Sequence, residues 1–187
     1  MSKFLLLLGP SGVGKSTIID ELIRLDSRFR YISPYMTRVL RDGEKNKISI
    51  SNEEMDDMRN QGKFLVINTL YGGIRYATPR APIIEALSAE LFPVLDWPVD
   101  KISLMRDAFP SQLYSVYVAP PSIKILSERL LKDGRDTDGS RLKNARDELE
   151  AFWSHRYDQV YDLAVTSEDG KISSVASAIY SNYLSSF

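Results

Sequence analysis

The sequence contains no cysteine, which excludes a disulfide framework, a cysteine-ligated zinc site and thiol redox chemistry. It also lacks long apolar runs. The longest, Phe4–Leu8, has five residues, too few for a membrane-spanning helix or for the apolar part of a signal peptide. The formal net charge is only −1, which argues against a strongly basic face for nucleic acid. We therefore expect a cytoplasmic protein with no targeting segment and with neither nucleic acid nor a membrane as partner.

What is present fits an ordinary globular domain of 187 residues, with 43% apolar and 26% charged residues. Apolar runs alternate with helical patterns, so we predict an α/β fold with a mostly parallel sheet flanked by helices. The predicted strands cover residues 4–8, 91–95, 113–118 and 163–165. The predicted helices cover 16–25, 52–60 with Ser51 as cap, 78 or shortly after to 89, 122–131, 141–155 and 172–184.

The chain is expected to form one domain over residues 1–187. Its core comprises 1–32 and 79–187, and an inserted lobe, 33–78, interrupts the regular α/β alternation with short runs and turn glycines. Pro79 and Pro82 suit the first turn of the helix that follows the lobe. Residues 132–140 are polar and contain two glycines between helical segments, so they are the candidate lid.

One motif carries specific chemistry. Residues 9–16 match the phosphate-binding pattern G-x-x-x-x-G-K-[ST], the P-loop, between a predicted strand and a predicted helix as the motif requires. Glycines let successive backbone N–H groups face phosphate oxygens, and the start of the helix adds its positive dipole end. The lysine reaches the outer phosphates, and the serine hydroxyl can bind Mg²⁺. The expected ATP-binding residues are Gly9, Pro10, Ser11, Gly12, Val13, Gly14, Lys15, Ser16 and Thr17, with Ser16 as the metal ligand.

Further segments resemble the guanylate kinase family. Residues 9–17 read GPSGVGKST, and 37–44 read TRVLRDGE, similar to the T-R-x-x-R-x-G-E segment of that family. Residues 76–78, 95–96, 119–122 and 141–148 resemble its Y-G-[ST], L-D, P-P-S and R-L-x-x-A-x-x-E segments. The matches follow the family's order across nearly the whole chain. The resemblance implies a kinase that uses ATP and Mg²⁺ and has a small phosphorylated molecule as its partner.

By the same resemblance, the acceptor's phosphate is held by residues of the inserted lobe, namely Arg38, Arg41, Tyr76 and Thr78. Arg135 and Arg141 are implied as lid-side cations on the transferring phosphoryl group, beside Lys15. Asp96 ends a predicted parallel strand, where ligands usually bind, so it is expected to order Mg²⁺ waters or to face the acceptor. Phosphoryl transfer needs cations and positioning more than covalent help, which suits this set of residues.

The positions that read guanine in this family depart from its pattern. Pro34 replaces a serine, Val66 a glutamate and Pro98 a second aspartate. A valine cannot accept guanine's N–H donors, so we predict that GMP is a poor substrate. Two further departures lie close by: a phosphate-binding tyrosine is lost or replaced by Lys47, and Trp97 stands at a small position and could line an altered pocket.

Three functions remain open from the sequence. The first is phosphorylation of GMP or another small phosphate ester. The second is a sugar-phosphate kinase, because residues 35–38 and 43–51 resemble, without gaps, the equivalent stretch of ribose 1,5-bisphosphate kinase. The third is a non-catalytic interaction module, which the intact Lys15 and Ser16 disfavour. The oligomeric state is left open.

Overall fold

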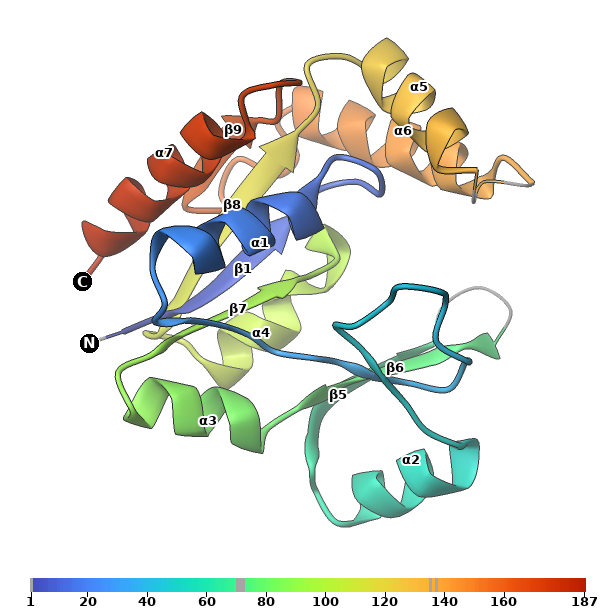
Figure 1. Ribbon diagram of the computed structural model, residues 1–187, viewed down its shortest axis with the longest axis vertical. Coiled ribbons are helices and arrows are strands. Elements are labelled where there is room, and N and C mark those ends of the chain that lie inside the picture. The colour runs from blue at the N-terminus through green and yellow to red at the C-terminus, as the bar shows by residue number, and fades with distance from the viewer. Residues whose placement is uncertain (1, 70–72, 135, 137) are drawn as a thin grey trace.

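A computed structural model describes residues 2–69, 73–134, 136 and 138–187, and its centre is a five-stranded sheet (Figure 1). The strand order is β2-β7-β1-β8-β9, and every neighbouring pair is parallel. The strands are β1 (Phe4–Leu8), β2 (Phe29–Tyr31), β7 (Phe92–Asp96), β8 (Leu113–Ala119) and β9 (Leu163–Thr166). The predicted α/β class with a parallel sheet is therefore confirmed.

Helices cover both faces of this sheet because its strands are apolar on both sides. In β1, Leu5 and Leu7 pack in one core cluster, whereas Phe4, Leu6 and Leu8 pack in the other. The first cluster joins α1 (Lys15–Leu25), α5 (Ile123–Asp133), α6 (Ser140–Trp153) and α7 (Ile172–Leu184). The second joins α3 (Ala81–Ser88) and α4 (Ile102–Ala108). Among the described residues, no helix is both long and apolar enough to cross a membrane.

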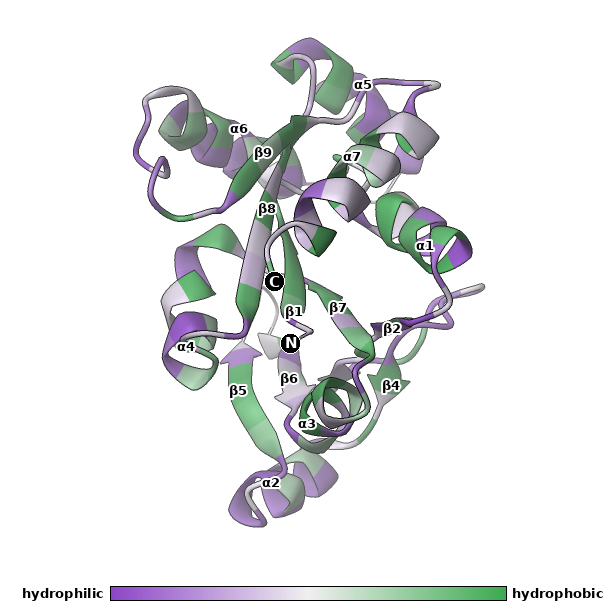
Figure 2. Cartoon of the chain, turned by 90° about the vertical axis from the view of Figure 1, so that its left-hand side faces the viewer, coloured by the Kyte–Doolittle hydropathy of each residue, from purple (hydrophilic) through white to green (hydrophobic). Residues whose placement is uncertain are grey.

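A second, four-stranded sheet lies beside the core (Figure 1). Its order is β4 (Ile48–Ser49), β3 (Tyr35–Met36), β6 (Arg75–Pro79) and β5 (Phe64–Thr69). Helix α2 (Asn52–Asn60) packs on it through Met55, and Ser51 caps this helix as predicted, in a capping box with Glu54. Figure 2 shows the other side of α2 as hydrophilic, which suits a helix with only one buried residue.

Several predicted boundaries shift by a few residues in the structure. Thr78 and Pro79 belong to β6, and the next helix begins at Ala81 with Pro82 in its first turn, so only Pro82 takes the predicted role. Helix α5 continues through Asp133 and α6 begins at Ser140, so residues 132, 133 and 140 of the predicted lid are helical. Helix α4 was not predicted at all, because a seven-residue helix shows too little periodicity.

Candidate functional site

The P-loop joins β1 to α1, and its shape depends on glycine. Gly9 has φ +124°, and a Cβ there would lie 2.3 Å from the carbonyl oxygen of Val118 in the neighbouring strand β8. Gly14 has φ +102° and precedes the first residue of α1. Left-handed backbone of this kind is costly for residues with a side chain. The turn therefore places backbone N–H groups at the start of α1, where an anion also meets the positive end of the helix dipole.

Lys15 turns back over this loop. Its ammonium donates hydrogen bonds to the carbonyl oxygens of Gly9, at 2.5 Å, and Pro10, at 3.0 Å. Burial is the main cause that lowers the pKa of Lys15, whereas the carboxylates of Asp96 and Glu148 oppose that shift. A phosphate in the loop would replace the two carbonyl groups as partner and would stabilise the Lys15 cation.

Arg141 connects α6 to the P-loop. Its guanidinium donates to the Ser11 hydroxyl at 2.6 and 3.2 Å and to the Asp133 carboxylate at 2.7 Å. Its side chain is only 24% exposed, and its bonds to Ser11 hold α6 against the loop although the two residues lie 130 positions apart in the sequence. This is the location that a lid-side cation requires. The other expected lid cation, Arg135, lies outside the described residues.

The expected metal ligand, Ser16, and the acid expected to order its waters or to face the acceptor, Asp96, lie on different elements. Ser16 is exposed in the first turn of α1. Asp96 ends β7, which pairs directly with β1, and its Oδ1 accepts a hydrogen bond from the Tyr31 hydroxyl at 2.9 Å. A serine hydroxyl and one carboxylate are oxygen donors that fit Mg²⁺, which usually keeps several waters and shares phosphate oxygens with few protein ligands.

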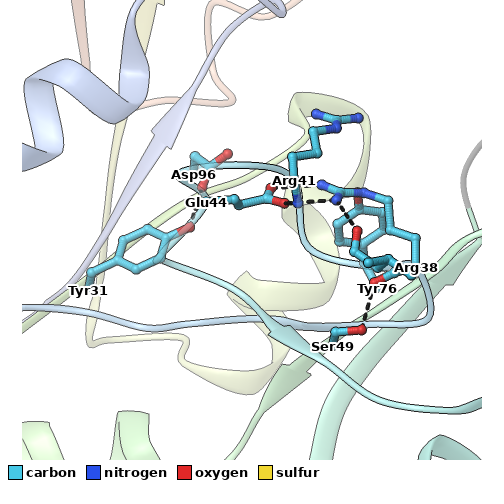
Figure 3. Close-up of polar contacts among 8 residues, drawn as sticks. Tyr31, Arg38, Arg41, Glu44, Ser49, Tyr76 and Asp96 are labelled. Atoms are coloured by element: carbon cyan, nitrogen blue, oxygen red, sulfur yellow. Dashed lines mark hydrogen bonds and ion pairs between the residues drawn. The ribbon is translucent and has the colours of Figure 1, made fainter.

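The inserted lobe contains a compact cluster of polar side chains (Figure 3). The Arg38 guanidinium makes two 2.7 Å hydrogen bonds to the Glu44 carboxylate and donates through Nε to the Tyr76 hydroxyl at 3.2 Å. The Arg38 guanidinium lowers the pKa of Glu44 from 4.5 to about 2. The structure thus brings together Arg38 and Tyr76, two of the residues expected at the acceptor's phosphate, but with an anionic partner that the resemblance did not assign.

The two remaining acceptor candidates differ in exposure. The backbone N–H of Arg41 donates to Glu44 at 3.1 Å, and its exposed side chain extends away from the Arg38–Glu44 pair (Figure 3). Arg41 is therefore accessible to a ligand. Thr78 is only 3% exposed in β6, where it pairs with Val66. Little of Thr78 is open to a substrate in this conformation.

The side chains at the substituted base-reading positions mostly pack against other residues. Pro34 is buried and its carbonyl oxygen accepts the N–H of Ile48. Val66 packs against the core cluster that contains Trp97. Trp97 itself is 5% exposed and donates its indole N–H to the Lys101 carbonyl, so little of Trp97 is open to a ligand in this conformation. Pro98 lines a cavity of about 700 Å³ together with Thr69, Asp100, Lys101, Glu148 and Tyr157.

Sequence reasoning gave no role to two residues at this site. Arg129 donates to the backbone carbonyls of Val13 and Ser167, at 3.2 and 2.8 Å, and so ties the P-loop to the loop after β9. No motif marks Arg129, since it is one of many charged helix residues. Glu148 accepts a hydrogen bond from Tyr117 at 3.1 Å, and burial raises its pKa. The sequence signal that could have identified Glu148 is its position as the last residue of the R-L-x-x-A-x-x-E match.

Comparison with known proteins agrees with this geometry. The family model described as guanylate kinase matches residues 1–180. A guanylate kinase from Clostridium tetani is 31% identical over 186 residues, which cover 95% of this chain and 88% of that protein. One from Trichormus variabilis is 30% identical over 173 residues, covering 89% and 83%.

A solved structure shows the same fold. The crystal structure of guanylate kinase from Anaplasma phagocytophilum has a TM-score of 0.76 at 21% identity, and the match covers 98% of this chain and 85% of that one. A P-loop with an intact Lys15, a parallel sheet and a match over nearly the whole chain lead to one conclusion. The chain belongs to the guanylate kinase family and is a kinase, a phosphotransferase that acts on a phosphate group.

Proposed function

We propose that this protein transfers the γ-phosphate of ATP to the phosphate of a nucleoside monophosphate, with GMP as the acceptor. One observation carries the proposal: Lys15 lies over the P-loop, on the carbonyl oxygens of Gly9 and Pro10, and Arg141 from the lid side donates to Ser11 in the same loop. Cations from two separate parts of the chain therefore meet at the P-loop. They would offset the charge of the phosphoryl group that is transferred there.

The donor side is assigned to the P-loop. Backbone N–H groups of residues 9–16 would hold the inner phosphates, and Lys15 would leave the carbonyl oxygens of Gly9 and Pro10 to bind the outer ones. Arg141, already on Ser11, would reach the transferring group after a small movement. Mg²⁺ would be held by Ser16, with its waters ordered by Asp96, and when bound it neutralises phosphate charge. A reaction that consumes ATP also fits the expected cytoplasmic location.

The acceptor side is assigned to the inserted lobe. Arg41 is accessible, and the Tyr76 hydroxyl, which accepts from Arg38, retains its own proton to donate to a phosphate oxygen. These groups would fix the acceptor in line with the donor. Orientation of this kind is the main contribution that a protein makes to phosphoryl transfer.

A phosphorylated sugar is a second candidate acceptor, favoured by one observation. Pro34, Val66 and Pro98 provide no side-chain hydrogen-bond acceptor where guanine would present its N–H donors. Loss of such pairing leaves buried donors unsatisfied and costs on the order of 1–3 kcal/mol for each group. GMP turnover with weak preference for guanine is therefore expected.

A turnover panel with Mg-ATP tests these assignments. GMP, AMP, other nucleoside monophosphates and ribose phosphates are compared by kcat/KM. We expect GMP to be phosphorylated with kcat/KM below the ~10⁴ M⁻¹s⁻¹ of slow enzymes, and other acceptors to compete with it. Efficient, guanine-selective turnover would mean that Asn68, Thr69 or Asp100 reads the base. No transfer to any phosphate ester would contradict the proposed function.

A further inference from the structure

The charge of Arg38 is already neutralised within the inserted lobe. A guanidinium has five N–H groups. In this structure Nε donates to Tyr76, Nη1 donates to both Val39 and Glu44, and Nη2 donates once to Glu44. Within the described part of the chain, one N–H of Arg38 is left for a ligand. A phosphate monoester with nearly two negative charges therefore needs further cations.

Lys47 lies beside this cluster. It immediately precedes β4, which pairs with β3, and β3 in turn pairs with β6 through Met36 and Tyr76. The Lys47 ammonium lies over the Tyr76 ring, 6.0 Å from its centroid. Lys47 is half-buried, whereas Lys45, two residues earlier, is exposed. The pairing of short strands thus fixes a cation above the phenol whose hydroxyl contacts Arg38.

The contact between Lys47 and the Tyr76 ring is weak. At 6.0 Å, the distance from the ammonium to the ring centroid is at the outer limit of cation–π contacts. An anion beside the Tyr76 hydroxyl would be a stronger partner for this ammonium, because hydrogen bonds between two charged groups are the strong ones.

We propose that Lys47 binds the phosphate of the acceptor, together with Arg41 and the Tyr76 hydroxyl. This assignment rests on the proposed function and specifies how the inserted lobe selects acceptors that carry a phosphate. Lys47 provides the positive charge that Arg38 cannot provide, because the charge of Arg38 is offset by Glu44. Uncharged analogues such as nucleosides would gain nothing from it.

Steady-state kinetics of Lys47→Met test the role, because methionine keeps most of the stem and removes the charge. With GMP as acceptor, we expect KM for GMP to rise about tenfold or more, as the loss of a charged hydrogen bond implies. KM for ATP should stay within about twofold, since the donor contacts are elsewhere. Lys47→Arg should recover most of the loss. Lys45→Met is the matched control and should behave as wild type.

Three results would overturn the proposal. KM for GMP could stay unchanged in Lys47→Met while Tm falls, which would make the residue a packing group on Tyr76. KM for ATP could rise as much as KM for GMP, which would place Lys47 on the donor. Lys45→Met could show the same rise, which would indicate only general surface charge.

Binding measured without turnover separates this proposal from the proposed function. GMP is titrated calorimetrically into wild type and Lys47→Met in the absence of ATP. A tenfold or greater loss of affinity in the variant supports the role of Lys47 even if no transfer is detected. Equal affinities, or no GMP binding by wild type, would reject it.

Discussion

The P-loop and the inserted lobe carry their hydrogen-bond donors on different parts of the chain. In the P-loop the donors are backbone groups, shaped by Gly9 and Gly14 beside strand β1, which is buried throughout, and strand β8, which is buried apart from its first residue. In the inserted lobe they are side chains, Arg38, Arg41 and Tyr76, on short strands and loops. A site built from backbone groups allows few substitutions, whereas single substitutions can change the ligand of a site built from side chains.

The largest expected difference between the two regions concerns Lys15. Lys15→Ala should lower kcat by at least tenfold, and on the order of 10²–10³-fold, because it removes a cation that acts on the transferring phosphoryl group. The fold should persist. Since burial lowers the pKa of Lys15, removal of that charge should not lower Tm. Lys124→Ala, on the exposed side of α5, is the control. Retention of more than a tenth of wild-type kcat would contradict the assignment of the P-loop as the catalytic phosphate site.

The next largest effect should be confined to binding of the acceptor. Arg41→Ala and Arg38→Ala should each raise KM for GMP about 10–100-fold, the equivalent of a lost charged hydrogen bond, with little change in KM for ATP. Replacement of either arginine by lysine should also raise KM for GMP. The compact charge of an ammonium cannot reproduce the planar, two-pronged hydrogen bonding of a guanidinium.

The Arg38 effect has an additional cause that can be isolated. Arg38→Ala leaves the Glu44 carboxylate without its partner beside the incoming phosphate. The double variant with Glu44→Gln should therefore recover part of the lost affinity. A rise in KM for ATP instead of GMP would show that the inserted lobe has been assigned the wrong ligand.

A pair of glycine substitutions compares the backbones of the two regions. Gly9→Ala and Gly43→Ala both force a side chain into left-handed backbone, but a Cβ at Gly9 meets the Val118 carbonyl whereas one at Gly43 meets nothing within 4 Å. We expect Gly43→Ala to cost about 1 kcal/mol and Gly9→Ala about 1–3 kcal/mol more, measured by denaturant unfolding. Equal losses would mean that the loop relaxes away from β8.

The smallest expected effect is the pH dependence of the Arg38–Glu44 pair. The pKa of Glu44 is lowered from 4.5 to about 2 by its bonds to Arg38, so the folded protein binds fewer protons there than the unfolded chain. The stabilisation is complete above pH 4.5 and is lost as the pH falls towards 2. Wild type should exceed Glu44→Gln in stability by on the order of 1 kcal/mol at pH 6, and less at pH 3. A Tm difference that is constant between these pH values would contradict this.

Much of the fold could be predicted because its signals are local. The apolar run Phe4–Leu8, the glycines of the P-loop and the periodic apolar residues of α7 each determine one element with little help from distant residues. The predicted ends of α3 and α6 were less accurate. Thr78 and Pro79 fit a strand only because β5 pairs beside them, and this pairing cannot be inferred from a helix-start pattern.

The sequence by itself determined the family and the P-loop, because short motifs in a fixed order are specific to a family. It also singled out Arg38 and Tyr76, which are in contact in the structure. The tertiary structure alone decided which charges remain for a ligand. It pairs Arg38 with Glu44, places Arg141 on Ser11 and brings Lys47 over the Tyr76 ring. The physical reason is that electrostatic interaction depends on distance in space and on burial, and neither is encoded in the separation of residues along the chain.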